Sequence, residues 1–197
     1  IGIDGFKTVN AGWLTLTAPP RTGLGSVTRH KVMVKRPFKK VFSTTVKAGP
    51  YKVGRYSLID ELWKLFREAN VLYWSKSLLK LTYNFIDCSI ASSPESPPFM
   101  VPRVRFVEAS LALAKTGSTR AVFLLEELIE GDDDVFVKFI HNMDANPLLD
   151  ELDYGYDIAE FFVFMQHVQY IKTGKLAFIS DYQGMSDSIH SIVLQLE

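Results

Sequence analysis

One long segment with helical periodicity constrains the fold of this chain more than any other feature. Across residues 56–87 apolar side chains recur at steps of three and four, the spacing of one face of an α-helix. Ser57 is placed to cap its start, and Asp60 and Glu61 follow where the helix dipole favours acidic side chains. We therefore expect a long helix here, which either continues through Asn70 or breaks near it.

Shorter segments with strand character lie on both sides of this helix. Alternating or β-branched runs predict β structure over 1–36, and Pro94, Pro97 and Pro98 exclude a regular element from residues 92–102. The order of elements is segregated rather than alternating βαβ, which predicts an α+β fold. The expected strands are 12–17, 30–36, 104–114, 121–131, 134–140 and 176–179, and a second helix is expected at 157–174.

Composition excludes several classes of protein. The chain has 22 Lys and Arg against 22 Asp and Glu, and this neutrality argues against a nucleic-acid-binding protein. No apolar run approaches the roughly 18 residues of a membrane span, so we expect no membrane partner. The single cysteine, Cys88, forms no intrachain disulfide, which is typical of a reducing compartment and predicts an intracellular, cytoplasmic location.

The apolar run at 176–179 ends abruptly in polar residues. Asp181 and Gln183 alternate in "SDYQG", so on a strand end both would point the same way. A carboxylate and an amide oxygen on one side suit Mg²⁺ that carries substrate phosphates. The other interpretation is an aspartate that caps a turn, with Gly184 allowing a positive φ.

Other candidate residues have two interpretations each. Lys35 is either an edge-strand lysine or a strand lysine that holds phosphates. The glycines of residues 1–12 form either a plain hairpin or a loop close to phosphates. Glu126 and Glu127 end a buried strand and are either helix-capping or solvated acids, or part of a hinge between two lobes. His167, alone on a helix, is typical of a packed histidine.

Taken in order, these segments resemble the alpha-kinase family of atypical protein kinases, and most of all its fungal branch. The resemblance covers most of the chain, in "GFKTVNAGWLTL", "VMVKRPF", "REANVLYWSKSLLKL", "VPRVRFVEASLALA", "FLLEELIEG", "FVKFIHN" and "QHVQYIKTGKLAFISDYQG". It implies one kinase domain over 1–197 with a two-lobed fold. About 1–125 would be an antiparallel, β-rich N-lobe with the long helix, and about 126–197 a hinge and an incomplete C-lobe.

The resemblance also implies a nucleotide site for ATP. Lys35 would contact the nucleotide phosphates, with Lys7 and the backbone near Gly5 beside them. Glu126 and Glu127 would form the hinge that meets adenine. Phosphoryl transfer needs positioning and neutralised charge more than covalent help, and these residue types supply both.

The catalytic and metal residues follow from the same resemblance. Asp181 would act as the catalytic acid/base or transition-state organiser, and Gln183 as a Mg²⁺ ligand beside it. Lys138 and Asn142 match a K-x-x-x-N pair that lines the phosphate and metal side. His167 falls where the family places one zinc-binding histidine.

The end of the chain departs from the family pattern. No "TDP" segment follows "DYQG", and the cysteine pair of the zinc site is absent, so we expect an incomplete zinc site and a truncated or divergent C-terminus. Three hypotheses therefore stand. The first is an ATP- and Mg²⁺-dependent kinase of protein Ser/Thr residues, and the second is an inactive pseudokinase or fragment that binds nucleotide or protein. The third, a generic α+β binding domain without nucleotide, requires the ordered match to be a coincidence. Glu61 and Glu68 are the candidate helix acids to pair with Lys35.

Overall fold

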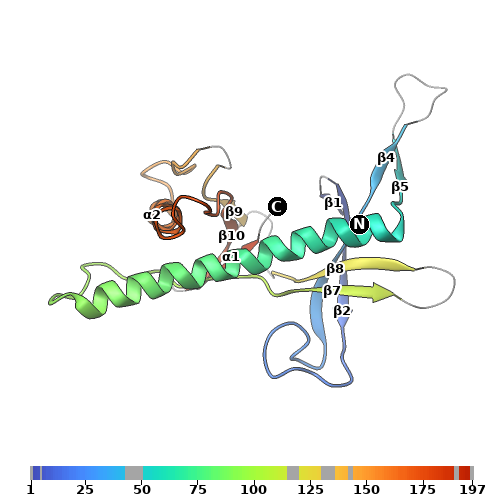
Figure 1. Ribbon diagram of the computed structural model, residues 1–197, viewed down its shortest axis with the longest axis horizontal. Coiled ribbons are helices and arrows are strands. Elements are labelled where there is room, and N and C mark those ends of the chain that lie inside the picture. The colour runs from blue at the N-terminus through green and yellow to red at the C-terminus, as the bar shows by residue number, and fades with distance from the viewer. Residues whose placement is uncertain are drawn as a thin grey trace. The chain divides into compact units, whose positions relative to one another are not determined.

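The computed structural model describes residues 2–4, 6–42, 51–114, 120–129, 136–141, 144–188 and 191–195. These residues form a mixed α+β fold with two helices and mainly antiparallel strands, as expected (Figure 1). They divide into two compact units: the first contains 1–71 and 108–128, and the second 72–107 and 129–197. Residues 72–107, which the sequence analysis assigns to the first lobe, thus cluster with the second unit.

The first unit is built on a five-stranded antiparallel sheet. The late strand β8 lies between β3 and β7, so the sheet is completed by residues far apart in the sequence. A separate antiparallel hairpin, β4–β5, follows β3. The strands are β1 (Gly2–Asp4), β2 (Lys7–Leu14), β3 (His30–Pro37), β4 (Lys39–Val41), β5 (Lys52–Gly54), β7 (Ala109–Ala114) and β8 (Ala121–Glu127).

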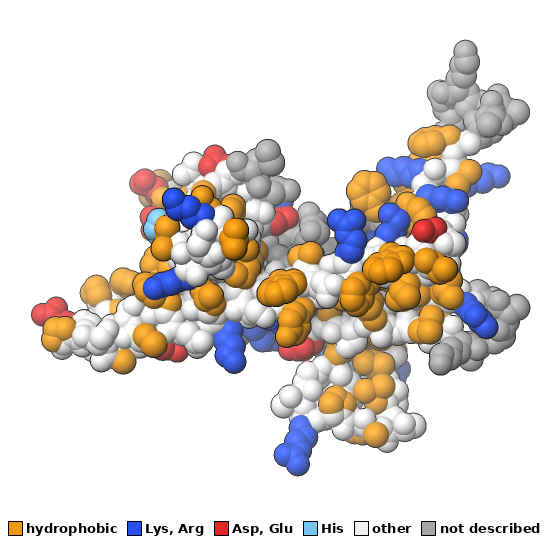
Figure 2. Space-filling view, in the orientation of Figure 1, with side chains coloured by type: hydrophobic (Ala, Val, Ile, Leu, Met, Phe, Trp, Pro, Cys, Tyr) orange, Lys and Arg blue, Asp and Glu red, His pale blue; other side chains and the backbone are white. Residues whose placement is uncertain are grey.

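The long helix α1 runs from Leu58 to Ser92 without a break at Asn70. Its start is as predicted, because the Ser57 Oγ accepts a hydrogen bond from the Asp60 N–H at 3.2 Å. Within the first unit, Leu65 packs with Val122 and Leu124 of β8. The outer face carries exposed apolar side chains: Ile59, Leu62, Trp63 and Phe66. Figure 2 shows hydrophobic side chains gathered along this helix.

The second unit contains a four-stranded sheet in the order β6–β11–β10–β9, in which only the β6–β11 pair is parallel. Helix α2 (Tyr156–Lys172) supplies much of the core. The Phe162 ring stacks on Tyr182 with 4.5 Å between centroids. The strands are β6 (Val104–Phe106), β9 (Phe136–Lys138), β10 (Gln183–Ser188) and β11 (Ser191–Gln195).

The predicted strand at 176–179 is wrong. The strand begins later, at Gln183, and residues 177–182 are irregular. Two glutamine side chains of α2 occupy the backbone groups that a sheet would use: Gln169 Oε1 accepts from the Ile179 N–H at 2.9 Å, and Gln166 Nε2 donates to the Ile179 carbonyl at 2.8 Å. Side-chain bonds of this kind compete with a strand ladder.

The expected strand at 104–114 is in fact two strands, β6 and β7, in different units. The Val107 N–H donates to the Leu194 carbonyl at 2.9 Å, inside the second unit. The next residue, Glu108, pairs instead with Glu127, inside the first unit.

Among the helices that the structure describes, none is long and apolar enough to cross a membrane.

Candidate functional site

The first unit holds Lys35 in a buried ion pair. β3 places Lys35 opposite Leu124 of β8 and opposite Val9 of β2, so apolar side chains surround it. Its Nζ lies 2.8 Å from Glu126 Oε2, and the two side chains are 3% and 2% exposed. A buried charge is tolerated only when it is paired, so each of these residues depends on the other.

The acids of α1 that were candidates for pairing with Lys35 contact other cations. Glu61, which is fully buried, accepts from Arg36 Nε at 2.9 Å and from Arg36 Nη2 at 3.1 Å. Glu68 accepts from Lys7 Nζ. The partner of Lys35 therefore comes from β8, and the bidentate Arg36–Glu61 pair joins β3 to the first turns of α1.

The two acids predicted to form a hinge both bond within the first unit. Glu126 contacts Lys35 as described, and Glu127 Oε2 accepts from the Glu108 N–H at 3.2 Å. Their roles toward adenine stay predictions. Gly5, predicted to lie beside the phosphates, falls outside the described residues.

In the second unit the structure brings Lys138, Asp181 and Gln183 together. β9 and β10 pair with Lys138 directly opposite Gln183. Lys138 Nζ lies 3.0 Å from Asp181 Oδ1, with the side chains 33% and 14% exposed. This contact is an ion pair without hydrogen-bond geometry, since Asp181 Oδ1 is buried and accepts no hydrogen bond from the described residues.

Tyr182, between Asp181 and Gln183, fixes this segment in the core. Its backbone carbonyl accepts from the Phe139 N–H at 2.9 Å, and its hydroxyl bonds to Gln169 Nε2 at 3.0 Å. Burial raises the pKa of the Tyr182 phenol above its usual range. Sequence analysis missed Tyr182 and Gln169, and the only available signal was the position of an aromatic residue between two polar ones.

The donor set of this cluster fits a hard cation. Asp181 and Gln183 offer carboxylate and amide oxygens, the ligand types that Mg²⁺ accepts. Asp181 Oδ1 already lies 3.0 Å from the Lys138 ammonium, so a cation bound through this oxygen has to displace Lys138. Gln183 is only 5% exposed, so its amide reaches a cation only if the cation sits close to the strand.

Among the remaining predicted residues, His167 does not join this cluster. His167 is exposed on α2, and Asn142 lies outside the described residues. Within the described parts of the chain, no group of three or more His, Cys, Asp or Glu is arranged to hold a metal ion.

Comparison with known proteins adds no assignment. No protein-family model matches the chain. No curated protein matches it either.

Proposed function

We propose that this chain is an ATP-dependent protein serine/threonine kinase of the alpha-kinase type. One structural observation carries the proposal: Lys138 of β9 lies opposite Gln183 of β10 and forms an ion pair with Asp181, which lies just before β10. The ordered resemblance of the sequence motifs to the family supports it. The α+β fold, with an antiparallel sheet and a long helix, is compatible with a two-lobed kinase of this type.

In this function each residue has a defined task. Asp181 accepts or orients the proton of the substrate hydroxyl. Lys138 holds the Asp181 carboxylate in position through their ion pair. Lys35 and Lys7 supply positive charge toward the phosphates. Asp181 and Gln183 would hold Mg²⁺, which neutralises phosphate charge when it is bound.

A second candidate is a pseudokinase that binds nucleotide or protein without phosphoryl transfer. One observation favours it: the Lys35 ammonium is almost fully buried and paired with Glu126. A lysine in that state contacts phosphates only after it leaves its carboxylate partner.

The test is transfer of labelled γ-phosphate from ATP with Mg²⁺, to the chain itself and to a generic basic protein. Wild type is compared with Asp181→Asn, which keeps the side-chain shape but removes the charge. Asp150→Asn, at an exposed loop position, is the matched control. We expect Asp181→Asn to lower the rate about 100-fold or more, the usual contribution of acid–base catalysis, and Asp150→Asn to leave it unchanged.

Each outcome separates the two candidates. Transfer by wild type that Asp181→Asn retains would show a kinase in which Asp181 is not catalytic. No transfer, with ATP still raising the melting temperature, would favour the pseudokinase. No transfer and no stabilisation by ATP would contradict both.

A further inference from the structure

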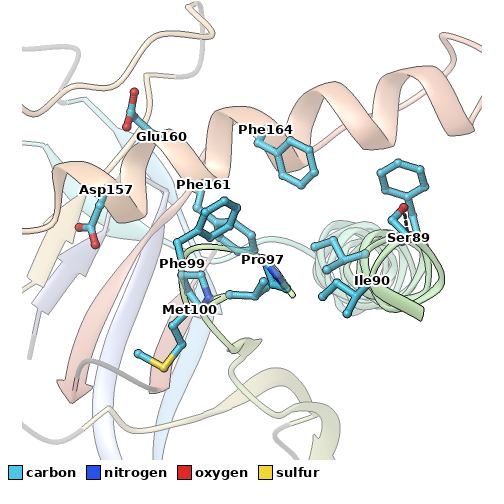
Figure 3. A pocket seen from close by; sticks show the side chains of 13 residues that line it. Ser89, Ile90, Pro97, Phe99, Met100, Asp157, Glu160, Phe161 and Phe164 are labelled. Carbon is cyan, nitrogen blue, oxygen red and sulfur yellow. Dashed lines mark hydrogen bonds between the residues drawn. The ribbon is translucent and has the colours of Figure 1, made fainter. Parts of the chain in front are cut away.

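A pocket of about 570 Å³ lies within the second unit, and its lining residues include none of Lys138, Asp181 and Gln183. Its walls come from the last turns of α1, from segment 97–102 and from the start of α2 (Figure 3). This volume falls among those of small-molecule sites, roughly 300–1,000 Å³.

The walls are apolar, and two of their side chains, Phe99 and Met100, are 66% and 60% exposed. Ten of the thirteen lining residues are apolar, and four of these are phenylalanines. Figure 3 shows Phe161 and Phe99 close to Pro97 in the middle of the pocket. Segment 97–102 is tied to α1, because Tyr83 Oη donates to the Pro102 carbonyl at 2.9 Å and accepts from the Val104 N–H at 2.8 Å. Tyr83 thus fixes the Pro102 end of this wall to the helix.

The charged lining residues are both acidic. Asp157 and Glu160, on the first turns of α2, lie at one end of the pocket, away from Ser89 and Ile90 (Figure 3). Both are exposed, so an ion pair here gains only a modest amount of affinity. The positive end of the α2 dipole offsets part of the Asp157 charge, and Glu160, further along the helix, adds a second negative charge at this end of the pocket.

One aromatic wall already accepts a cation in this structure. Lys172 Nζ lies 4.5 Å from the centroid of the Phe85 ring, a distance typical of a cation–π contact. Phe85 is one helical turn before Ser89, and the Ser89 hydroxyl donates to its carbonyl at 2.9 Å. A second cation is repelled from this end by Lys172 and attracted to the end with Asp157 and Glu160.

We propose that the pocket binds a small organic cation with an aromatic or aliphatic body. The body lies among the phenylalanine side chains, and its ammonium group points toward Asp157 and Glu160. This site is independent of the proposed kinase function, since it shares no residue with the Lys138–Asp181 cluster.

The test uses the whole chain and three probes that differ only in their head group: 4-phenylbutylamine, 4-phenylbutanol and 4-phenylbutyrate. Binding is followed by NMR through the methyl group of Met100, which lines the pocket. We expect the amine to bind about five- to tenfold more tightly than the alcohol, as two exposed carboxylates allow, and the acid to bind most weakly.

Variants assign the preference to the pocket. Asp157→Asn with Glu160→Gln should bring the amine to the affinity of the alcohol, whereas Asp150→Asn with Glu151→Gln, two exposed acids outside the pocket, should preserve the difference. Ser89→Trp should weaken all three probes by filling the space, with an unchanged circular dichroism spectrum as the control for folding. Equal affinity for the three probes, an unmoved Met100 signal, or an amine preference that survives the Asp157/Glu160 double variant would each overturn the proposal.

Discussion

Lys35 and Glu126 form a buried ion pair that requires β3 and β8 to be neighbours in the sheet. Their side chains meet across β3 and β8, strands that no pattern in the sequence identifies as neighbours. Sequence analysis marked both residues for separate roles, as phosphate ligand and hinge. Only the register of β3 against β8 brings them together, which is a property of the folded sheet.

We predict that Lys35→Met lowers the free energy of unfolding by about 3–5 kcal/mol, because it removes the positive charge that pairs with the buried Glu126 carboxylate. Replacing both residues, as Lys35→Met with Glu126→Leu, should recover most of this loss. Urea unfolding followed by circular dichroism measures both changes.

The control is Arg103→Met, which removes an ion pair to Asp87 in which both side chains are more than half exposed. Exposed pairs contribute at most about 1 kcal/mol, so its effect should be small. A Lys35→Met variant no less stable than Arg103→Met would contradict a buried, mutually dependent pair.

Gln169 organises the segment before β10 through three contacts. Its amide bonds to the Ile179 N–H, to the Tyr182 hydroxyl at 3.0 Å and to Thr82 Oγ1 at 3.3 Å. We predict that Gln169→Leu costs about 2–4 kcal/mol, because several buried polar groups lose their partners. Denaturant unfolding gives the value.

Gln166→Leu is the comparison for this prediction. Gln166 donates one bond, to the Ile179 carbonyl, and its buried Oε1 has no partner among the described residues. Its loss should therefore cost less than that of Gln169. The reverse order would show that the Gln169 contacts are not the ones that hold this segment.

At the scale of elements, periodic segments were predictable and locally bonded ones were not. The repeat of α1 and its cap at Ser57 were readable, because both depend on neighbours along the chain. The sequence pattern predicted a strand at 176–179 that does not form. The reason is not local, because side chains from a helix earlier in the sequence bind the backbone of Ile179. In the candidate site, Asp181 and Gln183 were visible as a pair, whereas the Lys138 contact required the register of β9 and β10.

The cap of α1 gives a prediction for this element alone. Ser57→Ala should destabilise the protein by about 1 kcal/mol, since the Asp60 N–H loses its acceptor. Ser77→Ala is the matched control: its hydroxyl bonds only to the Tyr73 carbonyl within the helix, and alanine favours a helix interior. In thermal unfolding, the melting temperature of Ser57→Ala should therefore fall, whereas that of Ser77→Ala should rise or stay the same.

For the whole molecule, stability should fall at alkaline pH. The pKa of the Tyr182 phenol is raised by burial, so above about pH 10 the unfolded chain loses this proton while the folded chain keeps it. The free energy of unfolding then falls by up to about 1.4 kcal/mol per pH unit for this group. Burial also raises the Tyr83 pKa, which adds to the slope.

Tyr182→Phe isolates the contribution of this group. The variant loses the bond to Gln169 at every pH, but its stability should fall less steeply than that of wild type between pH 10 and 11.5. Parallel curves for the two proteins would mean that the Tyr182 phenol titrates normally.

The path of the chain between its units has a consequence for synthesis. Each unit is assembled from two separate stretches of sequence, with crossings at 71/72, 107/108 and 128/129. While the chain emerges from the ribosome, β3 lacks its second neighbour until β8 is made, and α1 is complete long before α2 exists. Native contacts at such long sequence separation slow folding. Until Glu126 is translated, Lys35 has no native counter-ion, so the first unit closes only after β8 has been made.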